Sequence, residues 1–188
     1  MAATGMGIVG DIVESSGQPM LPKESCEARW YAVYTSAKHE KRVAEHLGIR
    51  EVEHFLPLYV SVRRWKDRRV KLELPLFPGY VFVRMALRER LRVLQIPGVA
   101  RLVGFGGMPI ALPEEEILAL RSGLAHGIRA EPHPFLRVGR RVRVKSGPLA
   151  GLEGVLLKRK KRAWLVVSVK LIQRSVAVEM EEADLVAV

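Results

Sequence analysis

The pattern of hydrophobic residues changes near residue 122, and this change constrains the fold more than any other feature of the sequence. Before it, segments with strand-like alternation are interspersed with segments of helical spacing, whereas only strand patterns follow residue 136. Residues 122–135 lack periodicity and contain two closely spaced prolines. We therefore expect an N-terminal domain at 28–121, a semi-extended linker at 122–135 and a C-terminal domain at 136–188.

The N-terminal pattern predicts an α+β fold. Ser36 is expected to cap a helix that continues to about Leu47, and Pro57 interrupts the second strand. Further helices are expected around residues 87–94 and from Pro113 onward, and strands at 29–35, 54–62, 68–74, 79–85 and 99–105. Strands alternating with helices predict an antiparallel or mixed sheet flanked by helices, an α/β sandwich.

The C-terminal segment predicts a small SH3-like β-barrel. Val142 and Val144 alternate with basic residues, and several short strands follow at close spacing. The intervening turn contains Gly147, Pro148, Gly151 and Gly154, where glycine allows a positive φ or close backbone approach. Taken alone, these are ordinary hairpin residues.

The chain carries a large positive charge. Its 31 Lys and Arg residues against 20 Asp and Glu give a net charge of +11. This excess favours a polyanionic partner, most commonly nucleic acid, although it also suits a basic protein whose charge serves solubility.

Other features narrow the class of protein. A single cysteine, Cys26, excludes a disulfide framework within one chain, and no apolar run approaches the length of a membrane-spanning helix. Residues 1–27 are predicted to be a flexible tail, and we expect a cytoplasmic protein. His39 and His46 lack an obvious third ligand, and no constellation supports catalysis, so we expect no metal, no cofactor and no enzymatic activity.

A basic stretch in the N-terminal half is a candidate nucleic-acid contact. The sequence VRRWKDRRVK is expected to form the tip of a β-hairpin, which either is simply solvated or contacts phosphates while its tryptophan stacks on an unpaired base. The candidate residues are Arg63, Arg64, Trp65, Lys66, Arg68 and Arg69.

Aromatic residues surround a Pro-Gly pair in the sequence LELPLFPGYVFVRM, residues 72–85. This stretch is either a buried strand entered through a turn or an aromatic surface held rigid for a partner. Sheet alternation places some of these rings in the core and leaves others exposed on the surface.

Together these segments resemble a known family. The stretch KSGPLAGLEGVLLKRK resembles the KOW motif, and with RWYAVYT, LFPGYVFVRM and IPGVARLVGFGGMPIAL it makes the chain from residue 29 onward similar to the NusG family of transcription factors. The family combines an N-terminal domain, a linker and a KOW domain. The basic hairpin is similar to that of specialised paralogues of the RfaH or UpxY type.

The resemblance implies where partners bind. The N-terminal domain of the family binds the clamp helices of the largest catalytic subunit of RNA polymerase, which here implies Tyr34, Phe77, Pro78 and Tyr80 as the exposed contact residues. Trp30, Val81 and Val83 are expected in the core. In the KOW domain the family has an aromatic residue followed by Gly-Arg for a ribosomal protein or the termination factor Rho. Here the corresponding candidates are Ile172 and Arg174, with Gln173 in place of the glycine.

The resulting expectation is a monomeric transcription elongation factor. It would bind RNA polymerase, suppress pausing, modulate termination or antitermination, contact upstream or non-template DNA, and recruit the ribosome or Rho through its KOW domain. The alternative is a ribosome-associated, RNA-binding KOW protein.

Overall fold

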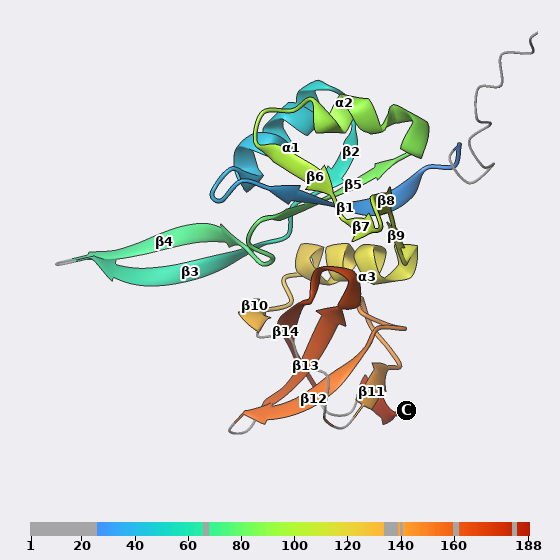
Figure 1. Ribbon diagram of the computed structural model, residues 1–188. Helices are drawn as coiled ribbons and strands as arrows, with labels where there is room; N and C mark the ends of the chain where they lie inside the picture. Colours follow the sequence, from blue (N-terminus) through green and yellow to red (C-terminus); the bar gives the residue numbers. More distant parts are fainter. Residues whose placement is uncertain (1–25, 66–67, 134–138, 140, 160–161, 182–183) are drawn as a thin grey trace, which may run out of the picture.

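The computed structural model describes residues 26–65, 68–133, 139, 141–159, 162–181 and 184–188 (Figure 1). Most of the expected N-terminal tail, part of the expected linker and residues 160–161 lie outside these residues. No helix in the described ranges is long and apolar enough to cross a membrane.

The N-terminal domain is built on an antiparallel sheet centred on strand β1, Arg29–Thr35. On one side β1 pairs with β5, and β5 pairs in turn with β2; on the other side β1 pairs with β6 and β9. The bounds of these partners are β2 Glu53–Phe55, β5 Tyr80–Met85, β6 Val99–Leu102 and β9 Ala111–Leu112. Because side chains alternate along a strand, the sheet has two apolar faces.

Two helices cover the first face. It carries Tyr31, Val33, Val81 and Val83, which pack with residues of α1 (Glu40–Ile49) and of α2 (Arg90–Leu94), the latter preceded by a 3-10 turn at Leu87–Glu89. Both helices were predicted, and so was the burial of the two β5 valines.

The cap predicted for α1 is wrong. Helix α1 begins four residues after Ser36, and its N-cap residue, His39, makes no side-chain capping bond. Lys38 has a positive φ of 64°, which interrupts a helix, and the Ser36 N–H donates to the Gly98 carbonyl oxygen at 2.8 Å. A contact distant in sequence therefore decides where the helix starts.

Helix α3, Glu114–Ala125, covers the second face of the sheet. Ile117 and Leu120 lie in one cluster with Trp30 and Phe82 of the sheet, so Trp30 is a core residue, as predicted. Two salt bridges connect the helix to the sheet, Arg84–Glu114 at 3.3 Å and Arg121–Glu53 at 3.2 Å. A third, Arg84–Glu53 at 3.6 Å, links strands β5 and β2.

Strands β3 (Leu58–Trp65) and β4 (Arg68–Pro75) form a separate two-stranded sheet that projects from the body as an arm (Figure 1). Leu56 and Pro57 separate β3 from β2, as the proline predicted. A second, shorter hairpin joins β6 to β9 and consists of β7, Gly104–Phe105, and β8, Met108–Pro109.

The C-terminal domain is a six-stranded antiparallel sheet in the order β10-β14-β13-β12-β11-β15. Val142 and Val144 are buried, as their alternation predicted. The elements are β10 Ala130–His133, β11 Arg141–Val144, β12 Glu153–Arg159, β13 Arg162–Val169, a 3-10 turn at Lys170–Ile172, β14 Arg174–Met180 and β15 Leu185–Ala187. The predicted α+β class, with a small all-β unit at the C-terminal end, is confirmed.

Much of the expected linker has regular structure. Helix α3 continues through Ala125, and residues 130–133 pair with β14. Only residues 126–129 therefore separate the helix from the C-terminal sheet.

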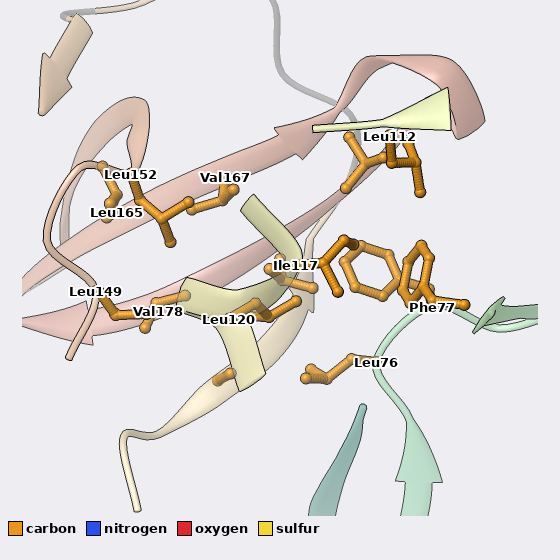
Figure 2. Close-up of a cluster of buried hydrophobic side chains, with 14 of the residues drawn as sticks. Leu76, Phe77, Leu112, Ile117, Leu120, Leu149, Leu152, Leu165, Val167 and Val178 are labelled. Atoms are coloured by element: carbon orange, nitrogen blue, oxygen red, sulfur yellow. The ribbon is translucent and has the colours of Figure 1, made fainter. Parts of the chain in front are cut away.

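Helix α3 also packs against the C-terminal domain, so one hydrophobic cluster contains residues of both domains (Figure 2). On the helix, Gly123 lies so close to Leu149 that a Cβ at this position would collide with the leucine side chain. Partial burial raises the pKa of the Glu116 carboxyl above its usual value, an effect that Lys170 of the C-terminal domain opposes.

Candidate functional site

The aromatic segment of the N-terminal domain forms a tight turn at residues 77–80. The Tyr80 N–H donates to the Phe77 carbonyl oxygen at 3.0 Å, and Gly79 has a φ of +85°. Proline at the second position and glycine with positive φ at the third position are the requirements of a type II turn. This turn leads directly into β5.

Two further hydrogen bonds hold the turn on the body of the domain. The Gly79 carbonyl accepts a bond from the Thr35 N–H at 2.8 Å, and the Gly79 N–H donates to the Glu40 carboxylate at 2.7 Å. Glu40 is only 6% exposed, so this is a largely desolvated, charge-assisted bond. The turn is therefore fixed between the end of β1 and the start of α1.

The turn presents two tyrosines at the surface. Tyr34 and Tyr80 are directly opposite in the β1–β5 pair, with ring centroids 5.3 Å apart and planes inclined by 53°. Tyr34 is 39% exposed, Tyr80 is half-buried and Pro78 is exposed. We call Tyr34, Pro78 and Tyr80 the tyrosine surface.

An arginine that sequence reasoning missed lies beside this surface. Arg101 of β6 is opposite Tyr34 on the other side of β1, and its Cζ atom lies 5.3 Å from the Tyr34 ring centroid. Tyr80, Tyr34 and Arg101 thus form one row across three adjacent strands. Only the pairing of distant strands creates the row, so no local sequence signal could have found it. Glu40 was missed for the same reason.

Phe77, which we expected on the exposed surface, is buried instead. It is 1% exposed and makes an edge-to-face contact with Phe82, with centroids 5.4 Å apart and planes at 85°. Figure 2 shows it in the same cluster as Ile117 of α3. Phe77 is the first residue of the turn and belongs to no strand, so strand alternation did not determine the direction of its ring. It belongs to the buried cluster against which Tyr80 packs.

The arm formed by β3 and β4 carries the predicted cationic cluster. Arg64 and Arg69 are directly opposite and both exposed, and Arg68 and Lys71 are exposed as well. Like charges directly opposite in a β-ladder destabilise it, so the pair favours an anionic ligand.

The other candidates of the arm are placed only in part. Lys66 lies outside the described residues, and the backbones of Arg63 and Trp65 are opposite Val70 and Arg68. A salt bridge of 3.8 Å between Lys41 and Glu73 connects the base of the arm to α1.

The glycine-rich turn of the C-terminal domain has the predicted geometry. Gly147 and Gly151 have φ values of +83° and +87°, and Pro148 is exposed between them. Gly154 instead allows β12 to approach β13, because a Cβ there would collide with the Val166 carbonyl.

The two candidate contact residues after β13 differ in exposure. Ile172 is 5% exposed and belongs to the cluster that both domains share, so it is not available as a surface contact here. Gln173 adopts the left-handed conformation that glycine would favour, with φ 49°, and Arg174 is exposed. Among the described residues no group of three potential metal ligands occurs.

Comparisons with known proteins agree with this geometry. A family model described as "Transcription termination factor nusG" matches residues 28–121. The chain is 30% identical over 173 residues to the transcription termination/antitermination protein NusG of Yersinia pestis and to that of Escherichia coli K12, covering 84% of this chain and 95% of each relative. For the Vibrio vulnificus protein of the same name the identity is 31% over 173 residues, with 84% and 94% covered.

A solved structure is similar in fold. The structure titled "Domain interaction in Thermotoga maritima NusG" matches 86% of this chain and 97% of its own, with a TM-score of 0.51 and 22% identity. The likeness therefore extends through both domains. The chain belongs to the NusG family of transcription factors.

Proposed function

We propose that this protein is an elongation factor that binds RNA polymerase through the tyrosine surface, with the clamp helices of the largest catalytic subunit as the docking site. It works in the cytoplasm without catalysing a reaction. The observation that carries the proposal is the pair of exposed rings, Tyr34 and Tyr80, held 5.3 Å apart on an anchored turn. Rigid aromatic residues make good interface anchors because they bury a large area while losing little conformational freedom.

Binding alone explains how such a factor suppresses pausing. A ligand shifts an equilibrium only by its difference in affinity for the two states. If the factor binds the actively elongating polymerase more tightly than the paused one, the paused state becomes less populated. Effects on termination or antitermination follow, since both depend on how long the polymerase pauses.

The basic arm is proposed to contact DNA beside the polymerase, either upstream duplex or the displaced non-template strand. Support comes from the exposed arginines Arg64, Arg68 and Arg69 and from the reach of the arm, about 26 Å for its eight-residue strands. Phosphate contacts position a protein without requiring a particular base sequence.

Replacing Arg68 and Arg69 together with alanine should make DNA binding less sensitive to salt. Each lost phosphate contact reduces the slope of log affinity against log salt by about 0.9 on duplex DNA, so the slope should become shallower by about 1.8. Fluorescence anisotropy across a salt series measures it. The control is the Arg88→Ala/Arg90→Ala pair, which removes the same charge from exposed positions elsewhere. An equal slope in both double variants would show that the arm does not contact phosphates.

The C-terminal domain is proposed to recruit a second partner, a ribosomal protein or Rho. Arg174 is exposed and available for such a contact, whereas Ile172 is buried in the arrangement described here. Because the domain is covalently attached, its partner meets the polymerase-bound factor at a raised effective concentration.

The decisive experiment is a reconstituted elongation assay on a template with a pause site and a Rho site. The Tyr34→Ala/Tyr80→Ala variant should lose pause suppression and bind polymerase at least about 30-fold more weakly, as expected for interface hot spots. Phe105→Ala is the matched control, because this aromatic side chain is exposed on another hairpin of the same domain.

Full activity of the double tyrosine variant would overturn the proposal. The alternative, a ribosome-associated RNA-binding protein, predicts co-sedimentation with ribosomes and no capture of purified polymerase. A single pull-down with both partners present separates the two functions.

A further inference from the structure

We infer that Arg101 is part of the docking surface and that its partner there is a carboxylate on a protein surface, presented beside apolar side chains. The inference rests on the proposed function, since it identifies the chemistry of the partner that the tyrosine surface binds. It adds a charged, directional contact to a site that would otherwise recognise only apolar area.

The position of Arg101 is fixed by the sheet. It belongs to β6 and is opposite Tyr34 in the β1–β6 pair, so its side chain emerges on the same face as both tyrosines. Its guanidinium lies over the Tyr34 ring, 5.3 Å from the centroid, in the arrangement of a cation–π contact. Stacking holds a guanidinium in place but leaves the N–H groups at its edge free.

Arg101 differs in this respect from three exposed arginines that are paired within the molecule. Arg121, Arg141 and Arg143 each form a salt bridge with a glutamate. No carboxylate in the described ranges pairs with Arg101, which is exposed and held by an aromatic ring alone. A guanidinium presents a planar set of donors that can bind both oxygens of a carboxylate, so Arg101 is available to bind a carboxylate of another protein.

The surroundings favour a protein carboxylate over a phosphate. Nucleic-acid affinity comes from several cations acting together, and the arm supplies such a cluster. At the tyrosine surface Arg101 instead stacks on one of two adjoining tyrosines, and among the described residues no other cation stacks on these rings. Tyrosine and arginine together are typical of protein–protein hot spots, and a charge at their edge sets orientation and partner choice.

The test measures binding of the full-length protein to purified core RNA polymerase that carries no nucleic acid. Arg101→Glu should weaken binding about 30-fold or more, as reversal of a hot-spot charge predicts. Arg101→Lys keeps the charge but loses the planar donor set, so its affinity should lie between those of the parent and Arg101→Glu. In a double-mutant cycle, Tyr34→Ala and Arg101→Ala should be non-additive, because the two side chains touch.

Arg129→Glu is the matched control. Arg129 is also exposed and stacks on an aromatic ring, with its Cζ atom 5.9 Å from the Trp164 centroid, but it lies beside the C-terminal domain. This variant carries the same charge change and should bind polymerase as the parent does. Unchanged thermal unfolding of Arg101→Glu would show that the loss is not a folding defect.

The other outcomes are distinguishable. If Tyr34→Ala weakens binding but Arg101→Glu binds as tightly as the parent, the inference about Arg101 is wrong and the proposed function stands. If neither variant weakens binding, the proposed function fails as well. If Arg101→Glu weakens binding only when the polymerase holds a DNA–RNA scaffold, the anion is a phosphate and the inference is overturned.

Discussion

Replacing Phe77 with alanine should lower the free energy of unfolding of the N-terminal domain by about 3–5 kcal/mol, the usual cost of removing a buried phenylalanine ring. The ring is 1% exposed and contacts Phe82 edge to face, so its loss leaves a cavity beneath the turn. Urea unfolding monitored by tryptophan fluorescence measures the change. Binding to polymerase should weaken only as the variant unfolds.

Comparison with the exposed Tyr34 distinguishes a residue that stabilises the fold from one that contacts the polymerase. Tyr34→Ala should cost little stability, because this ring is 39% exposed, yet it should weaken polymerase binding strongly. Phe77→Leu, which keeps most of the buried volume, should retain binding at low temperature. A Phe77→Ala variant that is as stable as the parent but cannot bind polymerase would show that the ring contacts the partner directly.

Replacing Gly154 with alanine should disrupt the C-terminal sheet. The new Cβ would collide with the backbone carbonyl of Val166, and a backbone atom in a strand pair cannot rotate away. Overpacking of this kind costs about 3 kcal/mol, which is a large part of the stability of so small a domain. Methyl NMR spectra should lose the dispersed signals of the C-terminal valines while those of Val81 and Val83 remain.

Gly151→Ala is the control for this prediction. It has a φ of +87°, but no atom lies within 4 Å of the added Cβ. The substitution should therefore lower the free energy of unfolding by only about 1–2 kcal/mol, because alanine disfavours the left-handed backbone conformation. The sheet should persist. Equal effects of the two substitutions would contradict the collision at Gly154.

The main elements of the fold could be predicted because their signals are local. Alternation along β1 and β5 separated the two faces of the sheet, and Pro57 marked the break between β2 and β3. Where long-range contacts decide the outcome, prediction failed. Ser36 has the side chain of a helix cap, but its N–H bonds to Gly98, and α1 starts four residues later.

In the candidate site, too, features that depend on long-range contacts were not predicted. The family resemblance implied Tyr34 and Tyr80 as exposed contact residues; Tyr34 is 39% exposed and Tyr80 is half-buried. Phe77 and Ile172 are buried in a cluster that contains residues of helix α3 and of both domains, which nothing in their own segments indicates. Arg101 was missed because its role depends on the register between β1 and β6.

The independence of the arm from the main sheet has a consequence for how such proteins diverge. Strands β3 and β4 form a two-stranded sheet of their own, separate from the sheet in which β1 pairs with β5. The length and charge of this hairpin can therefore change without shifting the register of the main sheet. Grafting the hairpin of one relative onto another would test whether the proposed DNA contact moves with it.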